Sequence, residues 1–291
     1  MAGKEFKSID EQLEILKSRG LDVSEEDKAK GFLYKNNYYR ISGYSLTLRK
    51  NDKFYEGVSF QNIIDIYEFD HEMRHILLKY IEIIEVRVKS IYAYEFTKVY
   101  GPTGYLDSDN FESLTIYDKV MDKAEEQKEK RLPYEAYLKH FVEDLKEDIP
   151  FWAYVDLLTF SDISFLYSIS DEQLKTIVAQ AFGLYKQSSI LLGKFLHSLT
   201  IIRNLCAHGG RLYNRLFEQK PNLSKYEKSF LIQKDGVVDN SHLYGFVLVM
   251  KRLLQRSEFL EMKTEIQALS KKYPFIDLKY YGFRNDWYLV L

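Results

Sequence analysis

The sequence predicts an all-α fold, and three observations carry this prediction. Apolar residues recur at steps of three and four over residues 60–99 and again over residues 192–205, which is the spacing of a buried helix face. The 291 residues include only five prolines, so few positions interrupt a helix. A hydrophobic content of 46% is ample for one large helical core or for two closely packed lobes.

Residues 1–58 are expected to form an N-terminal region of short elements. Helices are predicted over residues 9–18 and 25–34, where apolar residues follow helical spacing and cap-like residues stand at the ends. A short hairpin is predicted over residues 46–60. It is the one β element that the sequence suggests.

Residues 36–58 are rich in turn-forming and aromatic residues, so we predict a loop region there. The rings of Tyr38, Tyr39 and Tyr44 could stack on nucleic-acid bases. We interpret them instead as a small satellite core, because aromatic side chains in a loop more often pack on one another.

The longest helical pattern covers residues 60–99 and is terminated by Gly101 and Pro102. Forty residues at a rise of 1.5 Å span about 60 Å. Helices of that length are rarely straight, so we expect a kink or a break within it.

This helix also contains the string His71-Glu72-Met73-Arg74-His75, a literal HExxH. On a helix that spacing places two imidazoles on one face for zinc, and Glu95 is the third ligand that the sequence offers. Two features weigh against a zinc site: the segment continues as a packing helix, and Arg74 brings a cation close to the metal. A zinc metalloprotease therefore stays a minor alternative.

Residues 59–291 are predicted to form one helical domain with a charged insertion at about residues 101–150. The insertion is polar, and charge runs of this kind usually form a solvated face. We found no internal repeat, linker or low-complexity segment. Further helices are expected over residues 117–131, 132–146, 243–256 and 258–272, with a helix and a turn over residues 171–187.

Composition narrows the class of protein. The N-terminal residues MAGKEFKSIDEQLE lack a signal-peptide core and no apolar run approaches the roughly 20 residues of a membrane span, so we expect a cytoplasmic protein without a membrane partner. The single cysteine, Cys206, excludes an internal disulfide, and we interpret it as a small buried residue. Net charge is −2, yet residues 188–220 hold a local basic patch, namely Lys194, Arg203, Arg211, Arg215 and Lys220 against Glu218.

The most informative stretch is residues 195–215, FLHSLTIIRNLCAHGGRLYNR. An apolar helix ends there at two glycines, just after Arg203, Asn204 and His208. These three side chains supply a permanent cation, a neutral amide and a group that titrates near neutrality. Such a set suits phosphodiester chemistry without a metal.

Helical spacing constrains how these residues meet. Asn204 and His208 lie one turn apart on one face, whereas Arg203 and His208 are displaced by roughly 140°. Arg203 and His208 therefore come together only if His208 lies in a fraying last turn or if a second copy of the helix packs alongside. From spacing alone the structural interpretation is preferred, because both cations are favourable at a helix C-terminus by about 0.3 to 1 kcal/mol.

A family resemblance reverses that preference. Arg203-Asn204-x-x-x-His208 resembles the R-x4-H motif of HEPN-type ribonucleases, and the longer string RNLCAHGGRLYNR resembles the Abi-like proteins, the AbiD and AbiF group of bacterial abortive-infection proteins. NNYYRISGY, YEFDHEMR with IEIIEVRVKS, PFWAYVDLLTFSDISFLYSIS and the C-terminal YYGFRNDWYLVL resemble further segments of that family. Three residues depart from the family pattern: Asp156 replaces a Glu, Ser161 a Gly and Arg284 a Pro.

The resemblance implies a HEPN-like helical bundle and a toxin-like endoribonuclease of phage defence that needs no metal or cofactor. His208 would transfer protons, Arg203 would stabilise the phosphorane, and Asn204 would orient His208 or bind phosphate. Cleavage would leave a 2′,3′-cyclic phosphate. Support is expected from Glu85 and Asp156, and contacts to the RNA backbone from Arg211, Asn214 and Arg215.

HEPN-like domains typically pair, so the resemblance also implies a homodimer that brings two R-x4-H sets into one cleft. RNA is the expected partner, both as substrate and as a small non-coding inhibitor in a toxin–antitoxin arrangement. A second function class stays open, a non-catalytic RNA-binding or phage-sensing module on the same scaffold.

Overall fold

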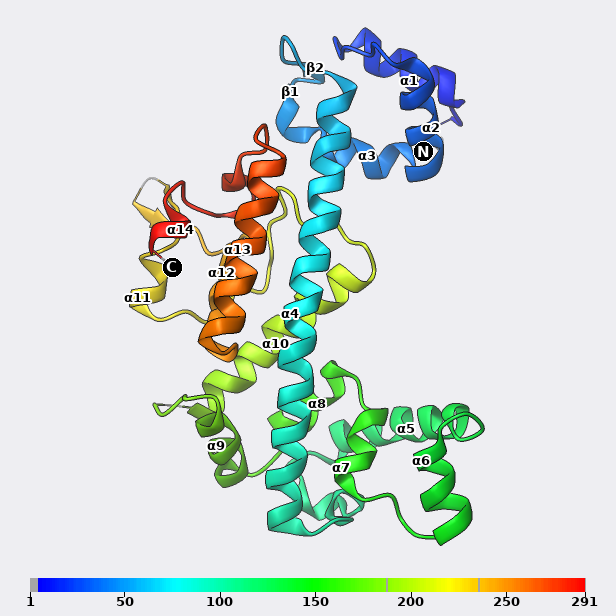
Figure 1. The fold of residues 1–291 in the computed structure, drawn as a ribbon, viewed down its shortest axis with the longest axis vertical. Coiled ribbons are helices and arrows are strands. Elements are labelled where there is room, and N and C mark those ends of the chain that lie inside the picture. The colour runs from blue at the N-terminus through cyan, green and yellow to red at the C-terminus, as the bar shows by residue number, and fades with distance from the viewer. Residues whose placement is uncertain (1–4, 187, 235, 291) are drawn as a thin grey trace.

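The computed structural model describes residues 5–186, 188–234 and 236–290, and it confirms an all-α fold. Its centre is helix α4 (Phe60–Tyr100), which runs the length of the molecule (Figure 1). The N-terminal elements surround the first turns of α4 (Figure 1). They are α1 (Ile9–Ser18), α2 (Glu26–Asn36), α3 (Tyr38–Tyr44) and a hairpin of β1 (Arg49–Lys50) and β2 (Lys53–Phe54).

The other end of α4 carries the middle of the chain, and the C-terminal helices lie alongside its first half (Figure 1). The middle elements are α5 (Leu114–Arg131), α6 (Ala136–Lys139), α7 (Phe151–Tyr154), α8 (Phe160–Ser168), α9 (Glu172–Ala181) and α10 (Ser188–Ala207). The C-terminal elements are α11 (Lys225–Lys228), the hairpin strands β3 (Gln233–Lys234) and β4 (Val237–Val238), α12 (Tyr244–Leu253), α13 (Arg256–Lys272) and α14 (Trp287–Val290).

Helix α4 is continuous over 41 residues, so the expected kink or break is wrong. The segment contains neither Pro nor Gly, the usual causes of a sharp kink, and Gly101 ends it with a φ of 81°. Packing also supports it along its whole length, because different neighbours cover successive turns. Its buried side chains include Ile63, Phe69, Leu77, Ile84, Tyr92 and Phe96.

Helix α10 crosses the middle of α4 and contacts α8, α9 and α12 as well. By length and composition alone, α10 is the one helix in the described part of the chain that could cross a membrane. Its apolar side chains Leu196, Leu199 and Ile202 are instead buried in the single hydrophobic core. The hydrophobicity of α10 is therefore accounted for by packing inside the bundle.

The N-terminal prediction is partly right. Helix α1 has the predicted bounds, and the hairpin pairs Arg49 with Phe54. The loop expected after residue 36 is wrong, because α3 forms there: Asn37, with a φ of 62°, accepts a hydrogen bond from the Tyr39 amide and starts the helix. The satellite-core interpretation holds for Tyr44, which is fully buried, and fails for Tyr39, which is 65% exposed.

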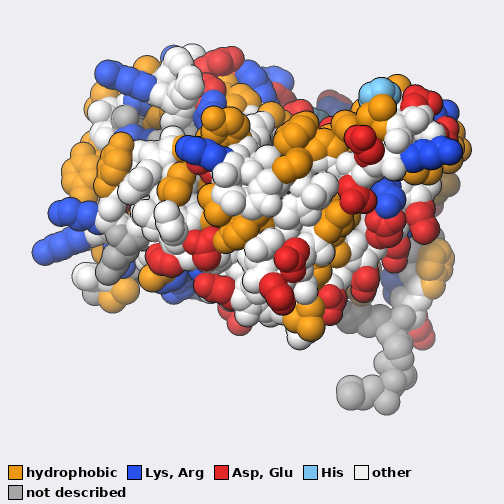
Figure 2. All heavy atoms as spheres, turned by 90° about the horizontal axis from the view of Figure 1, so that it is seen from below, with side chains coloured by type: hydrophobic (Ala, Val, Ile, Leu, Met, Phe, Trp, Pro, Cys, Tyr) orange, Lys and Arg blue, Asp and Glu red, His pale blue; other side chains and the backbone are white. Residues whose placement is uncertain are grey.

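The amphipathic helix expected over residues 132–146 is also corrected. Pro133 comes directly after Leu132, the C-cap of α5, and the chain turns before the four-residue α6 begins. A π-helical turn (His140–Leu145) then ends at Lys146, which has a φ of 56°. Figure 2, a view of the molecule from below, shows Lys and Arg side chains interspersed with Asp and Glu and with exposed hydrophobic side chains.

Candidate functional site

The turn after α10 carries the residues of the R-x4-H motif. The helix ends at Ala207, and the His208 amide still donates to the Asn204 carbonyl at 3.0 Å. Gly209 then takes a φ of 65°, and a side chain on Gly210 would lie 2.1 Å from the Leu205 side chain. Both glycines are thus needed for this tight reversal.

A buried carboxylate holds the far side of this turn. Asp70 of α4 accepts hydrogen bonds from the backbone amides of Leu212 at 3.1 Å and Tyr213 at 2.7 Å. Arg74, one helical turn along α4, pairs with Asp70 at 2.5 Å and donates to the Gly210 carbonyl at 3.3 Å. Together these contacts fix the backbone that follows His208.

Two tyrosines from distant parts of the chain complete this arrangement, which we call the Asp70 clamp (Tyr44, Asp70, Arg74, Tyr281 and the backbone of residues 210–213). The Tyr44 and Tyr281 hydroxyls each donate to Asp70 at 2.9 Å. Burial raises the pKa of the Asp70 carboxyl, whereas Arg74 and the donated hydrogen bonds lower it. The sequence signal for the clamp is the FDHEMR segment, which contains Asp70 and Arg74 and overlaps the HExxH string.

Arg203 is held by α4. Its Nε lies 3.5 Å from Oε2 of Glu85, and the other carboxylate oxygen of Glu85 lies 3.2 Å from the Lys89 ammonium group. Arg203 also donates to the side-chain oxygen of Asn204 at 3.4 Å. The structure therefore brings Arg203, Asn204 and the predicted support residue Glu85 together. Lys89 was not predicted, although its i,i+4 spacing from Glu85 is a recognisable signal.

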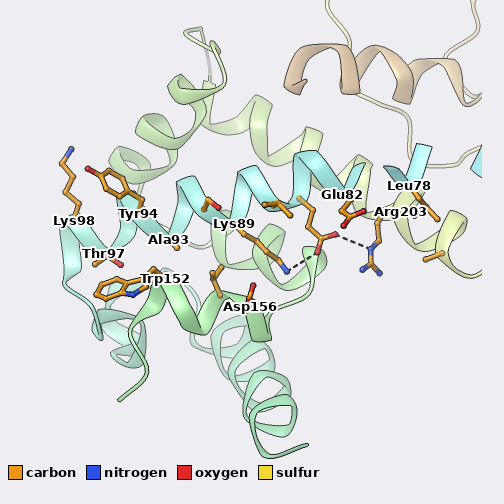
Figure 3. Close-up of a pocket in the computed structure, with 15 residues that line it drawn as sticks. Leu78, Glu82, Lys89, Ala93, Tyr94, Thr97, Lys98, Trp152, Asp156 and Arg203 are labelled. Carbon is orange, nitrogen blue, oxygen red and sulfur yellow. Dashed lines mark ion pairs between the residues drawn. The ribbon is translucent and has the colours of Figure 1, made fainter. Parts of the chain in front are cut away.

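Arg203 stands at one end of a groove of about 980 Å³ between α4, α7 and the end of α10. Trp152, Tyr94 and Lys98 stand at its other end, and Asp156 lies on the wall opposite α4 (Figure 3). Asp156 belongs to a 3-10 turn (Val155–Leu157) that follows α7. The charged side chains that line the groove are Glu82, Glu85, Asp156, Lys89, Lys98 and Arg203.

His208 does not line this groove, although its neighbour Ala207 does. His208 is exposed, and ideal helical spacing displaces the side chains of Arg203 and His208 by about 140° around the helix axis. Within the described residues no hydrogen bond joins the side chains of Asn204 and His208, and Asn204 contacts Arg203 instead. Arg203 thus lines the groove, and His208 does not.

The three residues expected to bind RNA backbone have different environments. Arg211 donates to the carbonyls of Tyr213 and Asn214, so its guanidinium braces the turn. The Asn214 amide donates to the Tyr280 carbonyl at 3.0 Å, and Asn214 has a φ of 48°. Arg215 is exposed and lies 5.6 Å from the centre of the Phe217 ring. Of the three, Arg215 is placed to meet a ligand from solvent.

Of the HExxH string, Glu72 contacts a neighbouring helix, whereas His71 and His75 are exposed. Glu72 accepts from Lys272 at 2.8 Å and from the Tyr273 hydroxyl at 2.7 Å, so both partners come from the helix α13 and its end. Glu95 lies twenty residues beyond His75 on the same continuous helix, which places it about 30 Å away. No group of three potential metal ligands occurs among the residues that the structure describes. The third ligand offered by the sequence therefore cannot reach the two histidines.

Cys206 lies on the buried face of α10, beside the clamp. It is 4% exposed, and burial raises the pKa of its thiol to about 12. A thiol with that pKa is almost wholly protonated near neutral pH and is a poor nucleophile. The interpretation of Cys206 as a small buried residue is confirmed.

Comparison with known proteins now adds to this geometry. A family profile described as "Abi-like protein" matches residues 31–214, which is more than half of the chain. The match includes Asp70, Arg74 and Glu85, and it ends directly after the turn at Gly209. No curated protein and no solved structure is found to match. On this family match, which covers the R-x4-H turn and all of the Asp70 clamp except Tyr281, the chain belongs to the Abi-like protein family.

Proposed function

We propose that this Abi-like protein is a metal-independent endoribonuclease that acts in abortive infection. One observation supports the proposal above the others: Arg203, positioned by Glu85, and His208, exposed on a turn fixed by the Asp70 clamp, are both presented to solvent at one helix end. Neither side chain is committed to the protein core.

RNA carries its own nucleophile, the 2′-hydroxyl, so cleavage needs proton transfer and charge stabilisation. In the proposed reaction the neutral His208 imidazole accepts the 2′-hydroxyl proton as that oxygen attacks phosphorus. The bond from phosphorus to the 5′-oxygen then breaks, and His208, which is now protonated, donates its proton to that oxygen. Arg203 neutralises the non-bridging oxygens of the phosphorane. The products are a 2′,3′-cyclic phosphate and a 5′-hydroxyl.

A homodimer is part of the proposal. Arg203 lines the groove and His208 does not, and helical spacing displaces the two side chains by about 140°, so a single phosphate would meet Arg203 of one protomer and His208 of another. The partner helix would then cross near the exposed end of α10. We also propose a cytoplasmic setting, in which RNA is the substrate and a small RNA restrains the enzyme.

The test is RNA cleavage in EDTA. We expect purified protein to cut total RNA with excess EDTA, and Arg203→Ala and His208→Ala to reduce the rate by at least about 100-fold, as for loss of a general acid–base group. Matched controls are His197→Ala and Lys194→Ala, because both side chains are exposed on the same helix away from the motif. Cyclic phosphate ends would be identified by mass spectrometry.

Three other outcomes would contradict the proposal. RNA binding without cleavage in every variant favours the non-catalytic RNA-binding or sensing module. Cleavage that persists in Arg203→Ala and His208→Ala shows that another site or a contaminant is responsible. Proteolysis that EDTA abolishes would restore the zinc metalloprotease.

A further inference from the structure

A second groove, of about 910 Å³, lies in the N-terminal region between the segment before α1, α2, α3 and the β1–β2 hairpin. Four aromatic side chains line it, and two of them are among the most exposed rings of the described residues: Phe6 at 89% and Tyr34 at 80%. Tyr38 and Tyr39 complete the set, with ring centres 6.1 Å apart and planes at 87°. We call this surface the aromatic groove.

The aromatic groove is also mildly basic. Lys7, Arg19 and Arg49 line it against Glu5 and Asp52. Asp52 is shared by two guanidiniums, at 2.8 Å from Arg49 and 3.7 Å from Arg19, so one carboxylate faces two cations. Arg19 also donates to the Tyr38 hydroxyl at 3.5 Å, which places a cation beside a ring.

Helix α3 connects this groove to the R-x4-H turn. Tyr39 and Ser42 line the groove, whereas Arg40, between them in sequence, donates to the Gly209 carbonyl at 2.5 Å. Consecutive helical residues point about 100° apart, so the groove and the turn flank the same short helix. Arg40 is exposed and adds a cation at the border between the two.

We propose that the aromatic groove binds single-stranded RNA and leads the strand to His208. Unpaired bases stack on the Tyr34 and Tyr39 rings, while Lys7 and Arg19 attract the phosphates. Aromatic rings combined with cations are the usual chemistry of single-strand binding, and paired bases cannot offer their faces to such rings. The proposal rests on the proposed ribonuclease function, because it names the form of RNA that the site takes.

The test measures binding without cleavage. A fluorescent single-stranded RNA of about 12 nucleotides, within the usual range of single-strand sites, is titrated against the full chain carrying His208→Ala. We expect Tyr34→Ala or Tyr39→Ala to weaken binding by about 5-fold or more each, in line with the loss of one stacked base, and the two Tyr→Phe variants to retain it. Tyr134→Ala and Tyr226→Ala are matched controls, since these tyrosines are 86% and 72% exposed outside the groove.

The outcomes separate this inference from the proposed function. Two results overturn the inference. One is equal affinity for the single-stranded RNA with the wild-type groove and with the double variant Tyr34→Ala/Tyr39→Ala. The other is equal affinity for the single strand and for a duplex of the same sequence. If the groove variants lose binding while His208→Ala changes no cleavage, the groove stands and the ribonuclease proposal fails. If cleavage depends on His208 but the tyrosine substitutions leave RNA affinity unchanged, the ribonuclease proposal stands and the groove inference fails.

Discussion

At the scale of single residues, the most connected side chain of the described structure is Asp70. It accepts hydrogen bonds from two backbone amides and two tyrosines and pairs with Arg74, and it is fully buried. The groups that surround the Asp70 carboxylate are all hydrogen-bond donors, so a side chain that itself donates does not fit there. The position therefore requires a side chain that accepts hydrogen bonds, and not merely one of the same size.

Asp70→Asn is therefore expected to destabilise the fold by about 3 to 5 kcal/mol, because it leaves the buried Arg74 charge without its counter-charge and turns an amide N–H towards donors. Urea denaturation followed by circular dichroism measures the free energy of unfolding. Asp10→Asn is the control, since Asp10 is an exposed partner of Lys30 and its loss should leave stability nearly unchanged. Equal stability of the two variants would contradict the clamp.

The Cys206 thiol gives a prediction about pH. Because burial raises its pKa to about 12, the reactive thiolate is scarce at pH 8 and its fraction rises about tenfold per pH unit up to that value. Native protein should react with a disulfide reagent far more slowly than urea-unfolded protein, in which the pKa returns to the ordinary range. Thiol titration with Ellman's reagent checks this, and a fast native reaction at pH 7 would show that Cys206 is accessible.

At the scale of elements, the end of α10 shows how local conformation positions chemistry. Gly209 takes a left-handed φ of 65°, which a residue with a side chain adopts only under strain. The resulting reversal turns the chain from the helix into the clamp within two residues. Because α10 ends at this turn, His208 is exposed to solvent.

Two glycine substitutions should have opposite effects. Gly209→Ala should destabilise the protein by about 1 to 2 kcal/mol through left-handed strain. Gly31→Ala should stabilise it by about 0.5 to 1 kcal/mol, because Gly31 is inside α2 and nothing lies within 4 Å of an added methyl group. Thermal unfolding gives both values, and a stabilising Gly209→Ala would mean that the turn differs from the one described.

Helices could be predicted reliably from the sequence where a local pattern of residues determines them. The prediction was incomplete where tertiary packing determines the length or start of a helix. Helical spacing, caps and glycines located α1, α10 and α13 to within a few residues. The expected kink in α4 was wrong although the absence of Pro and Gly from residues 60–100 argued against one; what the sequence could not show is which distant neighbours pack along the helix. Helix α3 was missed because a single Asn37 with positive φ starts it.

At the scale of the whole molecule, the proposed dimer rests on the placement of Arg203 in a groove that His208 does not line. Sequence spacing predicted their separation, and the family resemblance suggested Glu85 as a support. The Asp70 clamp and the aromatic groove could not be predicted in this way, since each joins residues from segments more than a hundred positions or several elements apart.

Complementation tests the composite site. Arg203→Ala and His208→Ala homodimers should each be inactive, yet mixing them under conditions of subunit exchange should restore up to about a quarter of wild-type activity, because half of the dimers are mixed and each has one intact Arg–His pair. Size-exclusion chromatography with light scattering gives the oligomeric state. No restored activity from exchanged dimers would place Arg203 and His208 of each site in one chain.

The Tyr281 hydrogen bond has a consequence for when activity can arise. Tyr281 lies 211 positions after Asp70 in sequence, so a growing chain cannot close the clamp until nearly all of the described residues have been made. Until then the turn at His208 lacks one of its anchors. Under the proposed ribonuclease function, this order of synthesis would keep the turn at His208 without its full set of anchors until Tyr281 has been translated, and so would delay RNA cleavage relative to the synthesis of the motif itself.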